Sequence, residues 1–121
     1  MAILSSEAKA LIASTRPAMV ATADMSGRPN VSPKGSFQVL DDEHVLFADV
    51  NSPHTIANLQ VNPYLSAIVF DAATRHGCRI WGTAQILESG EVFDRVNSQL
   101  AARNMQATHV VVVEVDSFTM Y

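Results

Sequence analysis

The sequence predicts a small antiparallel β-barrel with peripheral helices, which is a mainly β fold. Five or six apolar segments of strand length follow one another through turn sequences rather than through long helices, a pattern of hairpin-connected strands rather than of an alternating βαβ sheet. The 121 residues are 48% hydrophobic and 17% charged, as in an ordinary globular protein. We therefore expect a single domain over residues 1–121.

Six segments have the apolar character expected of strands. Some alternate polar and apolar residues and others are continuously apolar, and clusters of turn-forming residues separate them, as in strands joined by hairpins. The expected strands comprise residues 18–23, 29–40, 45–48, 65–70, 78–87 and 108–115. The second strand contains Pro33 and Gly35, which a regular central strand tolerates poorly, so we expect irregular backbone at residues 32–36.

Three further segments have the pattern of short helices. Apolar residues recur at helical spacing after Ser5 and again after Ser89, so each serine is the expected N-cap of a helix. A third helix is expected to begin at Ser52, because Pro53 follows at the first helical position and Asn62 precedes a proline that stops the helix.

Charge and cysteine content exclude several kinds of partner and location. The formal net charge is -4, and only 8 Lys and Arg residues are spread singly along the chain, so no basic stripe is available for a nucleic-acid backbone. Cys78 is the one cysteine, which rules out an intramolecular disulfide and is typical of a reducing compartment. The chain has neither a signal-peptide layout nor an apolar run of membrane-spanning length, so we expect a soluble cytoplasmic protein.

The common catalytic and metal-binding motifs are absent. The sequence contains no GxSxG, GxGxxG, P-loop or HExxH motif, and its 4 histidines lack the spacing of metal ligands, so we expect no metal site. Cys78 lies in an expected strand, where a lone cysteine is usually a small buried hydrophobe rather than a nucleophile. No residue is therefore assigned as a catalytic acid, base or nucleophile.

The expected helix start at Ser52 is the strongest candidate binding site. A helix N-terminus leaves backbone N–H groups unpaired at the positive end of the helix dipole, where they can hold a phosphate. Thr55 adds a hydroxyl, His54 can add positive charge, and Lys34 lies in the irregular second strand, where freed backbone can face a ligand. Most helix caps are purely structural, but this combination favours a phosphate held between Lys34 and the helix.

Three stretches in this order resemble the FMN-binding split barrels, the superfamily of pyridoxamine 5′-phosphate oxidase and of small bacterial FMN-binding proteins. The stretches are GRPNVSPKGSF, VLFADVNSPHTIANLQVNP and CRIWGTAQIL, and the resemblance covers nearly the whole chain. It implies a homodimer of six-stranded split barrels that binds one FMN per subunit in a groove at the dimer interface.

The resemblance also implies a set of cofactor-binding residues by position. The segment along the flavin ring and the ribityl chain comprises Ser32, Pro33, Lys34, Gly35 and Ser36. The strand end that contacts the ring edge through its backbone comprises Phe47, Ala48 and Asp49. The phosphate segment comprises Ser52, Pro53, His54 and Thr55, and Trp81 lies on a strand that faces the partner's cofactor.

Two departures from the family pattern bear on the activity. Pyridoxamine phosphate oxidases carry a basic pair where this chain has Pro53 and His54, and a longer C-terminal part supplies their substrate contacts. We therefore do not expect vitamin B6 oxidation, and Arg75 or Arg79 becomes a candidate for helping to hold the phosphate. If His54 faces the phosphate, FMN affinity should fall as the pH rises through the neutral range.

Several functions stay open at this point. An FMN-dependent oxidoreductase would pass electrons from a nicotinamide cofactor to a small substrate or to a redox protein. A small FMN carrier or electron-transfer protein would need no substrate site. A split barrel could also hold a deazaflavin or haem, as some relatives of this fold do, or keep an empty groove.

Overall fold

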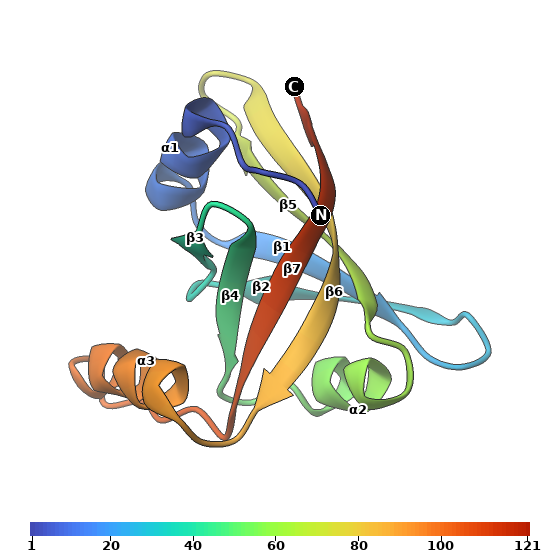
Figure 1. Cartoon of the computed structure of the whole chain (residues 1–121), viewed down its shortest axis with the longest axis vertical. Helices are drawn as coiled ribbons and strands as arrows, with labels where there is room; N and C mark the ends of the chain where they lie inside the picture. Colours follow the sequence, from blue (N-terminus) through green and yellow to red (C-terminus); the bar gives the residue numbers. More distant parts are fainter.

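A computed structural model describes residues 1–121. Its elements, in chain order, are α1 (Ser6–Ser14), β1 (Ala18–Ala23), β2 (Pro29–Lys34), β3 (Gln38–Asp41), β4 (His44–Asp49), α2 (Pro53–Val61), β5 (Tyr64–Asp71), β6 (His76–Leu87), α3 (Glu91–Ala101) and β7 (His109–Met120). The strands form one 7-stranded antiparallel sheet in the order β2-β1-β5-β6-β7-β4-β3 (Figure 1). The expected mainly β fold with peripheral helices is confirmed.

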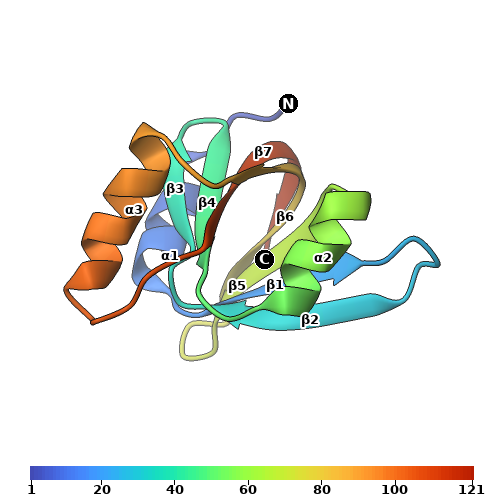
Figure 2. The ribbon, with the colours of Figure 1, turned by 90° about the horizontal axis from the view of Figure 1, so that it is seen from below.

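The strand expected over residues 29–40 is two strands, so the expected number of six strands is corrected to seven. The chain leaves β2 after Lys34 and turns through residues 35–37 before β3 begins. β2 pairs only with β1, and β3 pairs only with β4, so these consecutive strands form opposite edges of the sheet. Because a short turn joins the two edges, the sheet curls into a barrel that is open between β2 and β3 (Figure 2).

The three helices lie against different strands of the barrel. α1 contacts β3 and β6, α2 contacts β1, β2 and β6, and α3 contacts β7 (Figures 1 and 2). Ser5 caps α1 as expected, because its hydroxyl accepts a hydrogen bond of 3.1 Å from the Ala8 N–H. The expected cap at Ser89 is wrong by one residue: Gly90 is the N-cap of α3, and its φ of 104° suits glycine alone.

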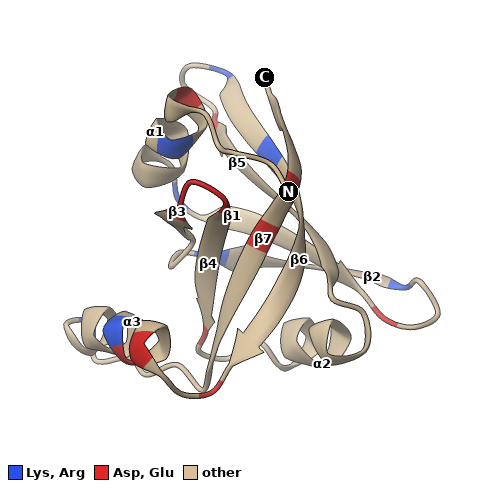
Figure 3. Cartoon of the chain, viewed as in Figure 1, with Lys and Arg blue, Asp and Glu red and all other residues tan.

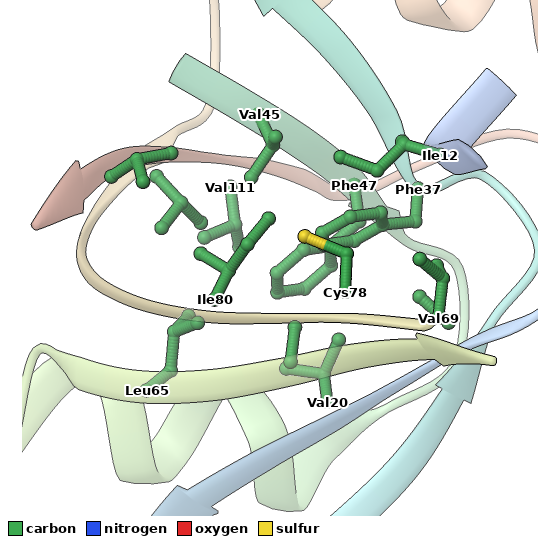
Figure 4. Close-up of a cluster of buried hydrophobic side chains, with 14 of the residues drawn as sticks. Ile12, Val20, Phe37, Val45, Phe47, Leu65, Val69, Cys78, Ile80 and Val111 are labelled. Atoms are coloured by element: carbon green, nitrogen blue, oxygen red, sulfur yellow. The ribbon is translucent and has the colours of Figure 1, made fainter. Parts of the chain in front are cut away.

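The barrel interior holds the main hydrophobic core. Ile12 of α1, Val20 of β1 and Ile80 of β6 meet there (Figure 4). Phe37, from the turn between β2 and β3, stacks on Phe47 of β4 with 6.5 Å between the ring centroids. The turn that joins the two sheet edges is therefore anchored in the core by an aromatic side chain.

A second, smaller hydrophobic cluster attaches α3 to the outside of the barrel. Its buried members are Leu46, Ala48, Val96, Leu100, Ala107 and Val110. Alternate residues of β4 point to opposite faces, so Phe47 packs in the barrel while Leu46 and Ala48 pack against α3. β4 is consequently buried on both faces, which fixes the position of its C-terminal end.

The surface carries scattered charges of both signs. Figure 3 shows no continuous basic stripe, and the turn between β3 and β4 is acidic. In the turn between β1 and β2, hydrogen bonds from the Ser26 side chain and the Arg28 backbone hold the pKa of Asp24 below its usual value. No helix is long and apolar enough to cross a membrane.

Candidate functional site

A cavity of about 300 Å³ lies where the break between β2 and β3 meets the end of β4 and α3. Pro33, Lys34, Gly35 and Ser36 line it from the end of β2 and the following turn. Ser36 is tied to the end of β4, because its Oγ accepts a hydrogen bond of 2.8 Å from the Ala48 N–H. The volume is at the lower end of the range for small-molecule sites, about 300–1,000 Å³.

The remaining lining is part polar and part apolar. The connection from β4 to α2 contributes Asn51 and Ser52, and α3 with its following residues contributes Val96, Leu100 and Met105. Two further cations, Arg16 and Arg103, also line the cavity, and no carboxylate does. The arrangement suits a ligand with an apolar body and an anionic group.

Lys34 is the central charged residue of this cavity. It is 5% exposed, its ammonium donates a hydrogen bond to Ser52 Oγ, and its Nζ lies 5.8 Å from the ring centroid of Phe47. No carboxylate forms an ion pair with it. Burial lowers the pKa of Lys34, and the charge of Asp49 opposes this shift in part. A buried cation without an ion-pair partner favours an incoming anion, because the anion compensates for the lost hydration.

Ser52 lies at the N-cap position of α2, as expected, but its side chain makes no cap hydrogen bond. The hydroxyl accepts from Lys34 instead, and the Ser52 N–H donates to Asp49 Oδ1 at 2.7 Å. Ser52 is therefore the N-cap residue of α2, as predicted, but its hydroxyl accepts from a lysine of a distant strand rather than from a backbone N–H of the helix. Ser52 instead connects the buried cation of the cavity to a buried carboxylate.

The start of α2 keeps free hydrogen-bond donors. The Ile56 N–H makes the first bond of the helix, to Ser52 O at 3.2 Å, and Pro53 has no N–H, so the free backbone donors belong to His54 and Thr55. Thr55 Oγ1 is buried and has no hydrogen-bond partner. The free backbone N–H groups fit an anion near the helix start, as the sequence suggested, whereas the Thr55 hydroxyl lies in the protein interior.

Asp49 contributes through its side chain, whereas the sequence suggested a backbone contact. It is 5% exposed at the end of β4. Besides the Ser52 N–H, its carboxylate accepts a hydrogen bond of 3.2 Å from Thr108 Oγ1 and lies 3.1 Å from His109 Nδ1. The carboxylate therefore holds the corner between β4 and α2 against the start of β7.

The structure brings only part of the predicted residue set to the cavity. The predicted residues that line it are Pro33, Lys34, Gly35, Ser36, Ala48 and Ser52. Ser32, Pro53 and Asp49 lie next to these in the chain but do not line it, while Phe47 and Thr55 point into the protein interior. Lys34 and the turn residues Gly35 and Ser36 are thus together with Ser52, whereas Arg16 and Arg103, the other two cations of the lining, were not predicted.

His54 lies outside this cavity. It shares a separate polar hollow with Arg28, Asn30 and Asn58, among others, on the α2 side of β2. The His54 side chain therefore does not contact a ligand bound in the cavity. The backbone conformation explains the difference, since residues 52 and 54 point to different sides of the first helical turn.

Trp81 and the two candidate arginines also lie away from the cavity. Trp81 is 40% exposed on the outer face of β6, and the Arg79 guanidinium lies 5.4 Å from the Trp81 ring and 5.2 Å from the Tyr121 ring. Arg75 lies in the turn between β5 and β6 with a φ of 62°. We call the exposed side chains Met19, Val31, Tyr64, Phe70 and Trp81, with Arg79, the outer sheet surface.

Sequence reasoning missed the contributions of Arg16 and α3. Arg16 donates from Nε to Gly35 O at 3.1 Å and from NH1 to Ala13 O at 3.0 Å, so it supports the turn as well as lining the cavity. The helical spacing of apolar residues after Ser89 predicted an apolar face on α3, but not the element against which Val96 and Leu100 of that face pack. The Gln38–Gln99 hydrogen bond of 3.0 Å joins β3 to α3 at this point.

The curled antiparallel sheet, open between two edges and covered by three helices, defines a split barrel of the FMN-binding superfamily. The profile of the pyridoxamine 5′-phosphate oxidase family matches residues 4–120. The chain belongs to this family. No curated protein sequence is significantly similar to it.

Several solved structures are similar to this chain. HupZ of Group A Streptococcus is 27% identical with a TM-score of 0.90, and the match covers 98% of this chain and 94% of HupZ. An FMN-binding protein from Syntrophomonas wolfei is 21% identical with a TM-score of 0.84, covering 93% and 82%. HutZ, the heme storage protein from Vibrio cholerae, is 24% identical with a TM-score of 0.69, covering 100% and 94%. The last two similarities concern the fold alone.

Proposed function

We propose that this chain is an FMN-binding flavoprotein whose cavity holds the cofactor with its phosphate close to Lys34 and the start of α2. The observation that carries the proposal is the buried Lys34 ammonium, which has no carboxylate partner and points its hydrogen bond at Ser52. An anionic phosphate would supply the missing countercharge. The free N–H groups at the start of α2 would add donors to the same group.

The rest of the cavity suits the flavin body. Val96, Leu100 and Met105 offer an apolar wall to an aromatic ring, and the backbone at Gly35 and Ser36 is outside regular strand pairing and free to face the ring. FMN, when bound, supplies electron and hydride transfer. The chain's own residues then bind and orient the cofactor, and no acidic or histidine side chain of the lining is placed to act as an acid or base.

The charges of the cavity support an oxidoreductase that acts on a small substrate or on a redox partner. The cavity carries the cations Lys34, Arg16 and Arg103, so an anionic electron donor such as a reduced nicotinamide cofactor would be attracted to it. A flavin carrier without a substrate site is the second candidate. Haem is less well supported, because Met105 is the one side chain in the lining of a type that commonly ligates haem iron, and no His, Cys or Tyr lines the cavity.

A homodimer is part of the proposal. The outer sheet surface exposes large apolar side chains on neighbouring strands, including Tyr64 at 67% and Phe70 at 49%, a grouping more typical of a contact surface than of solvated sheet. Replacing Trp81 with glutamate is expected to yield a monomer in size-exclusion chromatography with light scattering. The matched control replaces Val61 of α2, which is also exposed, and should stay dimeric; a monomeric parent would refute the homodimer.

The visible spectrum of the purified protein tests the cofactor. A flavin spectrum, or quenching of FMN fluorescence when FMN is added to the colourless protein, is the expected result. Anaerobic bleaching by NADH or NADPH would then support an oxidoreductase, whereas a flavin that only chemical reductants bleach would support a carrier. A protein that takes up a deazaflavin or haem but not FMN would overturn the proposal.

A further inference from the structure

A chain of polar contacts leads from the cavity to the surface on the side of β7. Lys34 donates to Ser52, and the Ser52 N–H donates to Asp49 at 2.7 Å. Asp49 and His109 are paired residues of β4 and β7, with His109 Nδ1 3.1 Å from Asp49 Oδ2. His109 Nε2 lies 3.3 Å from Glu88 Oε1, just beyond the end of β6. None of this was indicated by the sequence.

The imidazole of His109 therefore lies between two carboxylates. Asp49 from β4 and Glu88 from the segment after β6 are the charged groups in contact with it, Thr108 Oγ1 is its neutral neighbour, and Lys34 lies beyond Ser52. Only the charged imidazole can donate from both ring nitrogens, and the neutral form leaves one carboxylate without its donor. The charge of His109 thus decides how much of the negative charge of Asp49 is neutralised by the imidazole.

The extent to which the charge of Asp49 is neutralised affects the electrostatic field of Lys34. Asp49 acts as the distant countercharge of Lys34, since its charge opposes the effect of burial on that lysine. When a charged His109 neutralises Asp49, more of the positive field of Lys34 is left for an anion in the cavity. When His109 is neutral, Asp49 withdraws part of that field, and an anion binds more weakly.

We infer that His109 is a positioning residue of the cofactor site. It acts through Asp49, which holds the backbone of Ser52 and partly offsets the positive charge that Lys34 presents to the ligand. The identity of that ligand rests on the proposed function, whereas the contacts from Lys34 to His109 are present whatever the ligand is. The sequence suggested a similar pH dependence through His54, which the structure places in a different hollow. The two histidines can therefore be tested against each other.

The first test compares FMN affinity at several pH values in the parent, in His109→Gln and in the control His54→Gln. Glutamine keeps a donor for Asp49 but cannot gain charge. Because the FMN phosphate itself titrates near neutral pH, the informative quantity is the ratio of the Kd of each variant to that of the parent. For His109→Gln the ratio should be about fivefold at pH 5.5 and near one at pH 8.5, as for a weak coupling between sites.

A constant ratio for His109→Gln, or a pH-dependent ratio for His54→Gln alone, would overturn the inference. Thr108→Val is a second control, since it removes a neutral hydrogen bond to Asp49 and should change affinity equally at all pH values. His109→Ala should bind FMN more weakly than His109→Gln at every pH, because alanine leaves Asp49 without that donor.

A second test needs no FMN and so separates this inference from the proposed function. The Ser52 amide signal in nitrogen–proton correlation spectra of the cofactor-free protein should shift between pH 5 and 8, the range in which histidine changes charge. His109→Gln should abolish the shift. A Ser52 amide in the parent that ignores pH would refute the inference even if FMN binds.

Discussion

Replacing Lys34 with methionine is expected to stabilise the cofactor-free protein while it weakens cofactor binding. Methionine has a similar length, and the site is only 5% exposed, so the substitution removes a buried charge without opening a large cavity. Burial lowers the pKa of Lys34. Its charged form is consequently less favourable in the folded than in the unfolded chain, and at pH 7 the folded protein carries this cost.

The size of the effect follows from the contacts that are lost and the charge that is removed. Exchanging buried ion pairs for apolar side chains of similar volume is often neutral or stabilising by about 1–4 kcal/mol, and we take the same range for the single charge of Lys34. Against this, the hydrogen bond to Ser52 contributes about 1 kcal/mol, and the contact with the Phe47 ring, 5.8 Å away, about 0.5 kcal/mol. A net gain of about 1 kcal/mol corresponds to a rise in Tm of about 4 °C for a chain of this length.

If FMN binds as proposed, the same substitution removes a charge-assisted hydrogen bond to the cofactor phosphate. Such a bond contributes about 1.5–3 kcal/mol, so the FMN Kd should rise by about 10- to 150-fold. Fluorescence titration measures the affinity, and circular dichroism melts of the cofactor-free proteins measure the Tm.

The pH dependence provides a further check. As the pH rises toward the usual lysine value of 10.5, the folded parent loses the charge on Lys34, so the gap in Tm between parent and Lys34→Met should narrow. A Lys34→Met protein that binds FMN like the parent would refute the assigned role of Lys34. One that melts several degrees below the parent at pH 7 would refute the argument about the buried charge.

Two further substitutions and one thiol-modification experiment probe the packing of the fold. Thr55→Val should raise the stability of the cofactor-free protein by about 1 kcal/mol in urea unfolding, because it removes a buried hydroxyl without a partner; a loss of stability would indicate a hidden hydrogen bond. Gly82→Ala should cost about 2 kcal/mol or more in the same assay, since the added Cβ would lie 2.3 Å from Val113 Cγ1 and 2.7 Å from Glu114 O. Burial raises the pKa of the Cys78 thiol to about 11, so at pH 8 a disulfide reagent should modify it only on unfolding, and rapid modification of the folded protein would contradict its burial.

Local signals in the sequence predicted the local elements well. The serine cap of α1 was predictable because the hydroxyl and the amide it accepts from are three residues apart. β1 was bounded correctly because a proline precedes it and a glycine turn follows it. The irregular backbone near Gly35 was also predictable, since proline cannot donate a strand hydrogen bond and glycine weakens a strand, whatever the tertiary contacts.

Apart from the cap of α3, which lies one residue later than predicted, the features that the sequence did not predict depend on residues far apart in the chain. Nothing local showed that the two halves of residues 29–40 pair at opposite edges of the sheet, because strand partners are chosen by tertiary packing. Ser52 takes the N-cap position that its sequence predicted, but nothing local showed that its hydroxyl would accept from Lys34 of β2. The part played by His109 required knowing that β4 and β7 pair in a register that sets His109 opposite Asp49.

The turn at residues 35–37 couples local opening at the two exposed edges of the sheet. Ser36 is bonded to the end of β4 and Phe37 is anchored in the core, so neither β2 nor β3 can separate from the barrel without disturbing the wall of the cavity. A bound ligand would therefore raise the free energy of local opening at both edges at once. Amide hydrogen exchange should slow together in β1–β2 and in β3–β4 on ligand binding, although these hairpins lie at opposite ends of the strand order.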